Sequence, residues 1–188
     1  MNTHEFYMGQ AFDAYEFFGA HVTKEGVLFR TYAPNARRIQ VIGEFNEWQG
    51  HEMYQDGRSG IFSCCVPEAK IGMLYKYKVF GADGSEIDHC DPYGFEMQLR
   101  PESASVIRDL SGYQFEDETW MKKRGYRFDA PVNIYEMHLG SWRRKKDGES
   151  EEDTWYTYSE IAEELIAYVK ENNYNYIEFM PLSEHPAD

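Results

Sequence analysis

The first half of the chain, from Val27 to Ile107, consists of short segments in which apolar and polar residues alternate. Loops rich in Gly, Pro, Asn and Asp separate the segments. The segments are residues 27–33, 39–45, 61–66, 74–80, 85–90 and 104–109. Alternation with period two is typical of strands that bury one face. Strands at this spacing predict an immunoglobulin-like β-sandwich, in which two sheets each bury one face.

Residues 74–80 show the alternation most clearly, because Tyr75 and Tyr77 share one face and Lys76 lies on the other. Asp83-Gly84 follows and supplies the positive φ that a tight hairpin requires. The next segment is therefore expected to return antiparallel to this strand.

After about Gly112 the alternation ends. Residues 114–130 are charged and aperiodic, and we expect a linker there. Residues 132–139 and 176–182 then each contain an apolar strand core.

A helix is expected between these two strands. Thr157 can cap its start, Glu160 can complete a capping box, and Tyr156 can pack on Ile161 as a hydrophobic staple. Apolar residues at helical spacing follow. Asn172-Asn173 is expected to end the helix.

A strand, a helix and a strand form a βαβ unit with parallel strands, and a single unit cannot cover both faces of its sheet. A complete β/α barrel takes about 250 residues. We therefore expect residues 131–188 to be the start of an incomplete (β/α)8 barrel. Residues 15–113 would form the sandwich, residues 114–130 the linker and residues 1–14 an N-terminal tail.

Composition narrows the choice of partners. The 188 residues carry a net charge of −14, which disfavours phosphate backbones and anionic lipids as ligands. We expect neither nucleic acid nor a membrane as a partner. The N-terminal residues lack the basic start and apolar middle of a signal peptide, and no apolar run approaches the roughly 18 residues of a membrane span. A cytoplasmic protein is expected.

The three cysteines, Cys64, Cys65 and Cys90, form neither a disulfide framework nor a repeat with the ligand spacing of a zinc site. We expect no metal and no cofactor. Aromatic residues make up 16% of the chain, and flat aromatic faces are a common means of holding sugars.

Several sequence motifs resemble the N-terminal part of glycogen branching enzymes, which are members of the α-amylase superfamily. They are FRTYAPNARRIQVIGEFNEW, LYKYKVF, DPYGFEMQLRPESASVI, VNIYEMHLGSW and YIEFMPLSEHP. The GEFNEW motif is similar to a motif found throughout starch- and glycogen-binding sandwiches. The motifs DPYGFEMQLRPESASVI and VNIYEMHLGSW together are more specific, and this combination resembles branching enzymes.

This resemblance implies a 1,4-α-glucan branching enzyme, which transfers α-1,4-glucan chains to form α-1,6 branches with retention at the anomeric carbon. Such chemistry uses two carboxylates about 5 Å apart. In the family these residues follow later barrel strands, so no catalytic residue can be assigned here. The resemblance thus implies that these 188 residues are inactive alone. It also implies an α-1,4-glucan ligand and a sandwich that packs on the missing barrel. The alternative is a non-catalytic glucan-binding or scaffold module.

Trp48 and Lys76 match carbohydrate-binding positions of the related glycogen-binding modules, and Asn46 is a third candidate in the sandwich. Trp48 would stack on a sugar ring, or else pack on the sandwich edge or against the barrel. Lys76 would bind glucan hydroxyls, or else be a solvated lysine. Asn46 would bind hydroxyls or hold its turn, and the turn is favoured. Glycogen-binding modules of the type found in AMP-activated kinase, called kinase-type modules below, carry a second stacking tryptophan after the hairpin. This chain has Ser85-Glu86 there.

Four residues near the expected barrel strands are candidates for shaping a substrate cleft. They are Glu136, His138 and Trp142 after the first strand, and His185 after the second. Loops that follow barrel strands form the active face of such enzymes. The alternative for Glu136 and His138 is packing inside the barrel.

Overall fold

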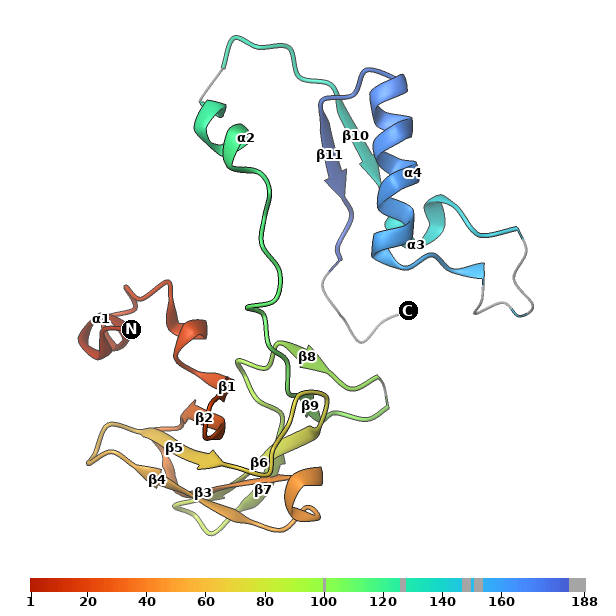
Figure 1. Ribbon diagram of the computed structural model, residues 1–188. Coiled ribbons are helices and arrows are strands. Elements are labelled where there is room, and N and C mark those ends of the chain that lie inside the picture. The colour runs from red at the N-terminus through yellow and green to blue at the C-terminus, as the bar shows by residue number, and fades with distance from the viewer. Residues whose placement is uncertain (100, 126–127, 147–149, 151–153, 183–188) are drawn as a thin grey trace. The chain divides into compact units, whose positions relative to one another are not determined.

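The computed structural model describes residues 1–99, 101–125, 128–146, 150 and 154–182 (Figure 1). The chain divides into two compact units, Met1–Glu116 and Asp117–Asp188, called unit 1 and unit 2 below. No helix within the described residues is long and apolar enough to cross a membrane.

Unit 1 is built from β-strands that follow one hydrogen-bonded path, β1-β2-β5-β4-β3-β6-β9-β8, with β7 also paired to β6. The strands are β1 Gly19–Thr23, β2 Gly26–Tyr32, β3 Ala36–Gly43, β4 His51–Gln55, β5 Ile61–Val66, β6 Leu74–Gly81, β7 Glu86–His89, β8 Glu96–Met97 and β9 Ser105–Val106. The short helices are α1 Thr3–Tyr7, η1 Ala14–Glu16 and η2 Glu44–Asn46. All six expected strands are present, and β1, β4 and β8 are additional.

Strand β4 connects the two halves of this sheet, β1-β2-β5 and β3-β6-β9-β8. Its Met53 pairs with Ile39 of β3, whereas its Tyr54 pairs with Ser63 of β5. One strand that changes partners along its length lets the sheet curl back on itself. The predicted β-sandwich is therefore confirmed, as a single curled sheet.

The core of unit 1 contains side chains from both halves of the curled sheet. Phe29 and Phe62 come from one half, and Ile39, Val41 and Tyr77 from the other. These are the inward positions of the alternating segments, since Lys76 beside Tyr77 is only partly buried. The face assignment made from the alternation is correct for Tyr75, Lys76 and Tyr77 of β6.

A buried carboxylate ties β6 to the segment that follows β7. The phenols of Tyr75 and Tyr77 donate to Oδ2 of Asp91 at 2.7 and 3.0 Å. The backbone N–H of Tyr93 donates to Oδ1 at 2.9 Å, and the N–H of Asp91 donates to Oγ of Ser105 at 2.8 Å. Burial raises the pKa of Asp91, and the three donors partly offset that effect.

Helix α1 lies in the segment expected as a tail and packs on the sandwich. The ring of Phe6 lies 4.8 Å from that of Phe18 and 5.1 Å from that of Tyr32. The hydroxyl of Tyr7 donates to the carbonyl of Ser59 at 2.7 Å. These contacts fix the helix to the sandwich.

Unit 2 contains the expected βαβ arrangement. Its elements are α2 Glu118–Lys123, β10 Ile134–Met137, α3 Leu139–Trp142, α4 Tyr158–Glu171 and β11 Tyr176–Phe179. Strands β10 and β11 pair in parallel, and α4 connects them (Figure 1). The short helix α2 falls within the expected linker.

Helix α4 begins and ends as the sequence predicts. The N–H of Glu160 donates to Oγ1 of Thr157 at 3.3 Å, and the N–H of Thr157 donates to Oε2 of Glu160 at 2.8 Å. Tyr156 packs on the cluster that contains Ile161. Asn173 has a φ of +60°, a left-handed conformation that stops the helix.

Candidate functional site

The loop after β3 presents Trp48 at the surface of unit 1. Glu47 and Trp48 have φ values of 54° and 59°, and the N–H of Trp48 donates to the carbonyl of Gly43 at 2.8 Å. The Trp48 side chain is 42% exposed although it is a large apolar group. Two successive non-glycine residues in the left-handed region cost about 1–2 kcal/mol each, and such strain persists where the surrounding structure imposes it.

Asn46 holds this loop in shape. Its Nδ2 donates to the carbonyl of Val41 at 3.1 Å, and its Oδ1 accepts from the N–H of Gly43 at 2.9 Å. Both ends of the amide are thus engaged with backbone. Asn46 stabilises the turn that carries Trp48, which is the alternative that the sequence favoured.

Two further contacts fix the loop to the start of β6. Oε2 of Glu44 accepts from the N–H of Leu74 at 2.9 Å. A Cβ on Gly43 would lie 2.5 Å from the carbonyl oxygen of Leu74 and 2.7 Å from the ring of Phe45. Glycine is therefore required at this close approach.

Lys76 lies at the same end of the β3–β6 pair as this loop. It is opposite Ile42, the residue before Gly43, in the strand register. Its Nζ donates to Oγ of Ser103 at 3.1 Å, and the side chain is partly exposed. The register thus places Lys76 near the backbone that anchors Trp48.

The hairpin after β6 is polar where a second tryptophan would stand in the kinase-type modules. Oγ of Ser85 donates to Oδ1 of Asp83 at 2.6 Å. Nζ of Lys78 lies 3.0 Å from Oε1 of Glu86 and 3.2 Å from Oδ1 of Asp88, and these contacts raise its pKa. The hairpin therefore supplies ion pairs and no aromatic face.

In unit 2, Glu136 lies on the exposed face of β10, the side away from the buried Met137. The parallel register places it beside Glu178 of β11. Glu178 is exposed in β11, and it follows Ile177, which packs on the buried cluster of unit 2. The position of Ile177 in the apolar strand core is the sequence signal that places Glu178 on the opposite face. His138 follows β10, and its Nδ1 lies 2.9 Å from Oγ of Ser141.

Trp142 packs within unit 2. Its Nε1 donates to the hydroxyl of Tyr135 at 2.9 Å, and its ring lies 5.6 Å from that of Tyr168. The guanidinium of Arg143 lies 4.3 Å from its centroid. This tryptophan supports the face of helix α4. His185 lies outside the described residues.

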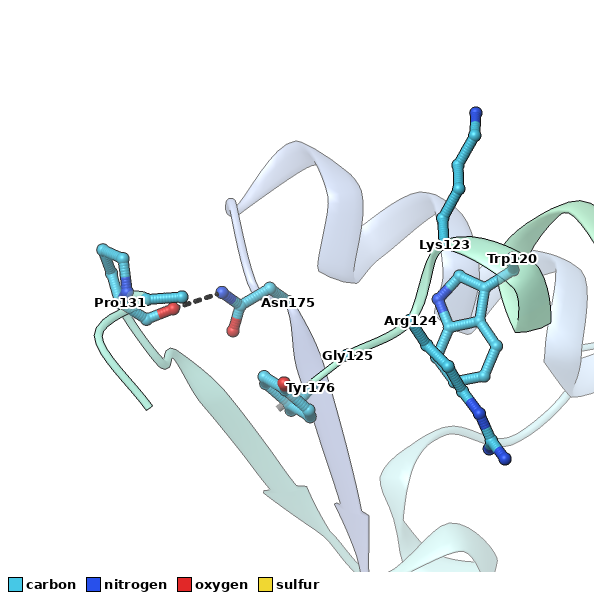
Figure 2. A pocket seen from close by; sticks show the side chains of 8 residues that line it. Trp120, Lys123, Arg124, Gly125, Pro131, Asn175 and Tyr176 are labelled. Atoms are coloured by element: carbon cyan, nitrogen blue, oxygen red, sulfur yellow. Dashed lines mark hydrogen bonds between the residues drawn. The ribbon is translucent and has the colours of Figure 1, made fainter. Parts of the chain in front are cut away.

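Unit 2 contains a hollow of about 710 Å³. Figure 2 shows side chains that line it, among them Trp120, Lys123, Arg124 and Tyr176. Asn175 Nδ2 donates to the carbonyl of Pro131 at its rim, at 2.8 Å. Both residues precede their strands, so the hollow lies at the N-terminal ends of β10 and β11. In a β/α barrel the residues at the N-terminal ends of the strands contribute to stability, and the active site lies at the C-terminal ends. None of the predicted site residues lines this hollow.

Among the described residues, no group of three or more His, Cys, Asp or Glu side chains is arranged to hold a metal ion. The groups that can contact a ligand at the Trp48 loop are the exposed indole of Trp48, the ammonium of Lys76 and backbone groups.

Comparison with known proteins adds three findings. Residues 17–94 match the family Carbohydrate-binding module 48 (Isoamylase N-terminal domain). The chain is 42% identical over 191 aligned positions to a 1,4-alpha-glucan branching enzyme of Geobacillus stearothermophilus, covering 97% of this chain and 29% of the relative. It is 40% identical to the corresponding enzyme of Fusobacterium nucleatum, covering 100% of this chain and 30% of the relative.

The fold is similar to that of a solved apo pullulanase from Paenibacillus barengoltzii. The TM-score is 0.67 at 18% identity, covering 96% of this chain and 31% of that chain. The chain thus spans about 30% of the length of the branching enzymes that it matches.

Proposed function

We propose that this chain is the N-terminal portion of a 1,4-alpha-glucan branching enzyme. The proposal rests on its match to the N-terminal region of such enzymes and on the match of residues 17–94 to carbohydrate-binding module 48. Its sandwich would bind α-1,4-glucan as an accessory surface. The whole enzyme would transfer glucan chains to form α-1,6 branches, using carboxylates supplied by chain that these residues do not contain.

The observation that carries the binding proposal is the exposed Trp48 on its strained loop. Residues 43–48 are fixed by backbone hydrogen bonds, by Asn46 and by Glu44. A rigid loop that holds a large apolar ring in solvent loses little entropy on binding a ligand. The C–H groups of a pyranose pack on an aromatic plane, and the ammonium of Lys76 can donate to hydroxyls.

Binding by this loop alone would be weak. Burying one aromatic side chain contributes on the order of 1–3 kcal/mol, and a millimolar Kd corresponds to about 4 kcal/mol. The hairpin at Ser85 adds no second ring. We therefore expect millimolar affinity for short maltooligosaccharides at the Trp48 loop.

Unit 2 would be the start of the catalytic barrel. Glu136, His138 and His185 would lie on its active face in the whole enzyme, and Trp142 would support that face from behind. The domain limits of this proposal are residues 15–113 for the sandwich and 131–188 for the barrel segment, joined by residues 114–130. A cytoplasmic location stays a prediction.

The alternative is a glucan-binding or scaffold module without catalysis. The exposed strand faces of unit 2 argue against it, since Ile134 and Tyr176 are open to solvent. A binding module gains nothing from two strands that are covered on one side only.

Affinity electrophoresis in a gel containing glycogen tests the proposed binding. We expect glycogen to retard the wild-type chain and Trp48→Ala to lose most of the retardation. Trp120→Ala is the matched control, because this tryptophan is also exposed but lies in unit 2. Equal retardation of the wild type and Trp48→Ala would contradict the role of this loop.

The chain alone is expected to leave amylose unbranched, as judged by the iodine-complex spectrum. Measurable branching by the 188-residue chain would contradict the assignment of catalysis to residues beyond it.

A further inference from the structure

The two ends of the curled sheet in unit 1 meet along a seam that contains a hollow of about 500 Å³. One wall is formed by η1 and β1, and the other by the residues before β8 and after β9. The lining residues are Tyr15, Glu16, His21, Val22, Phe95, Arg108, Asp109, Leu110 and Ser111. We call this hollow the seam site. Its volume lies within the range of about 300–1,000 Å³ that is usual for small-molecule sites.

The two walls of the seam site pack closely on each other beside the hollow. The ring of Phe18 stacks on that of Tyr93 at 5.1 Å, and the ring of His21 lies 5.9 Å from that of Phe95. Gly19 has a φ of +104°, and a Cβ there would lie 2.9 Å from the carbonyl oxygen of Tyr93. The two walls are thus held together without a ligand, so the hollow is preformed.

The apolar part of the seam site includes groups that are open to solvent. Tyr15 is 51% exposed, and Val22 and Leu110 are also exposed. An exposed tyrosine next to aliphatic side chains presents a flat apolar surface with a polar tip, which suits the C–H face of a pyranose.

The polar groups offer both donors and acceptors. Nε2 of His21 donates to the carbonyl of Phe18 at 2.9 Å, so Nδ1 of the neutral ring can accept a hydrogen bond. Hydrogen bonds from the Ser111 side chain and backbone hold the pKa of Asp109 below its usual value, so its carboxylate is an acceptor at neutral pH.

Arg108 supplies the donor. Its Nε and Nη2 donate to the two carboxylate oxygens of Glu96, which fixes the guanidinium plane. Within the described residues its Nη1 makes no hydrogen bond, so it can donate to a ligand.

The charges of the seam site select the class of ligand. Glu96 compensates Arg108, and the carboxylates of Glu16 and Asp109 add further negative charge, so an anionic ligand would be repelled. A neutral polyhydroxyl compound could instead pack on the apolar surface at Tyr15 and donate hydrogen bonds to His21 and Asp109. It could also accept a hydrogen bond from Arg108.

From this geometry we infer that the seam site is a second binding site for α-1,4-glucan on the sandwich, which shares no residue with the Trp48 loop. This inference rests on the proposed function, which supplies the glucan as the ligand. Two weak sites on one rigid unit can engage one branched polymer together, and avidity then exceeds the affinity of either site. The seam site would thus compensate for the single tryptophan of the Trp48 loop.

The test measures binding of maltoheptaose by calorimetry and of glycogen by affinity electrophoresis, using the 188-residue chain. The variants are Tyr15→Ala and Asp109→Ala. The matched controls are Tyr54→Ala, a tyrosine that is 71% exposed, and Asp56→Ala, both in the same unit and outside the hollow. Circular dichroism and the unfolding midpoint establish that each variant is folded.

We expect Tyr15→Ala and Asp109→Ala each to weaken binding of glycogen about 3- to 10-fold, the effect of losing one stacking or polar contact. The controls should bind as the wild type does. Trp48→Ala should retain residual binding of maltoheptaose, which Trp48→Ala combined with Tyr15→Ala abolishes.

Complete loss of binding in Trp48→Ala, with Tyr15→Ala equal to the wild type, would overturn the seam site and leave the proposed function intact. Absence of any glucan binding by the wild type would overturn both. If Tyr15→Ala is too unstable to purify, Asp109→Asn gives the same decision, because it keeps the size of the side chain and removes the charge.

Discussion

The two units of the chain bury their strands in different ways. In unit 1 the curled sheet encloses a core supplied by both of its halves. In unit 2 helix α4 covers one face of β10 and β11, and the buried cluster contains Met137, Leu139, Ile161, Leu165 and Val169. On the other face Tyr176 is 57% exposed. Unit 1 thus encloses its core between two halves of its own sheet, whereas in unit 2 the second face of β10 and β11 is not covered by other described residues of that unit.

The polar interactions of the two units also differ in how deeply they are buried. The carboxylate of Asp91 in unit 1 is buried and receives three hydrogen bonds. The ion pairs of unit 2 lie at its surface, as in Arg143 with Glu164 and Lys145 with Glu160. Exposed pairs add little to stability, typically less than about 1 kcal/mol. Unit 1 is therefore expected to be much the more stable of the two. Four measurements of stability test this difference.

The largest effect is expected for Asp91→Ala. This change leaves the buried phenols of Tyr75 and Tyr77 without their acceptor, at about 2 kcal/mol each, so the free energy of unfolding of unit 1 should fall by about 4 kcal/mol. Urea unfolding followed by near-ultraviolet circular dichroism measures it. Asp88→Ala is the matched control, since Asp88 forms only an exposed ion pair with Lys78. Equal stability of the two variants would show that the buried network is dispensable.

Leu165→Ala should destabilise unit 2 by about 2–3 kcal/mol and leave unit 1 unchanged, because Leu165 belongs to the separate core of unit 2. In a Trp48→Phe background tryptophan fluorescence follows unit 2 selectively, because the other three tryptophans, Trp120, Trp142 and Trp155, lie there. Ile166→Ala, an exposed neighbour on the same helix, is the control. A parallel shift of both units would mean that they unfold together, and the comparison would fail.

Thr157→Ala removes the N-cap of α4 and should destabilise unit 2 by about 1 kcal/mol. Thr157→Ser keeps the hydroxyl and should restore most of the loss. If alanine and serine behave alike in fluorescence-detected unfolding, the capping box has no part in the stability of α4.

The smallest effect is a pH dependence from the same capping box. Hydrogen bonds from Lys145 and Thr157 lower the pKa of Glu160 from 4.5 to about 2. Because the folded pKa lies below the unfolded value, this contribution is complete above about pH 4.5 and is lost as the pH falls toward 2. Asp91 acts with the opposite sign, since its raised pKa makes its contribution largest in acid and smaller as the pH rises.

Unfolding midpoints of unit 2 between pH 5 and pH 2 test this effect in the wild type and Glu160→Gln. The variant should lose less stability over this window, because glutamine has no proton to gain. Identical pH profiles would exclude Glu160 as the source.

The sequence predicts the parts of each unit whose burial repeats regularly. Burial alternates along the whole of β2, from Phe62 to Val66 in β5 and from Leu74 to Lys78 in β6. Helix α4 carries both its capping box and its apolar stripe. Strand β4 escaped prediction because only Met53 among its residues is buried, so no alternation is visible. Strand β8 has two residues and depends entirely on its partner β9.

The candidate sites also combine features that the sequence predicts with features that depend on tertiary structure. Trp48 and Lys76 are visible as motif positions, but the left-handed backbone at Glu47 and Trp48 has no sequence signal, since neither residue is glycine. The seam site joins residues near position 20 to residues near position 110. Its formation depends on how the sheet curls, which local patterns do not encode.

Glucan binding by the sandwich is tested most directly by titrating the isotopically labelled chain with maltoheptaose and following the amide chemical shifts. We expect shift changes in unit 1, around residues 43–48 and Lys76 and around the seam site, with unit 2 unaffected. Changes confined to β10, β11 and α4, or none at millimolar ligand, would contradict the claim that the sandwich is the glucan-binding part of this chain.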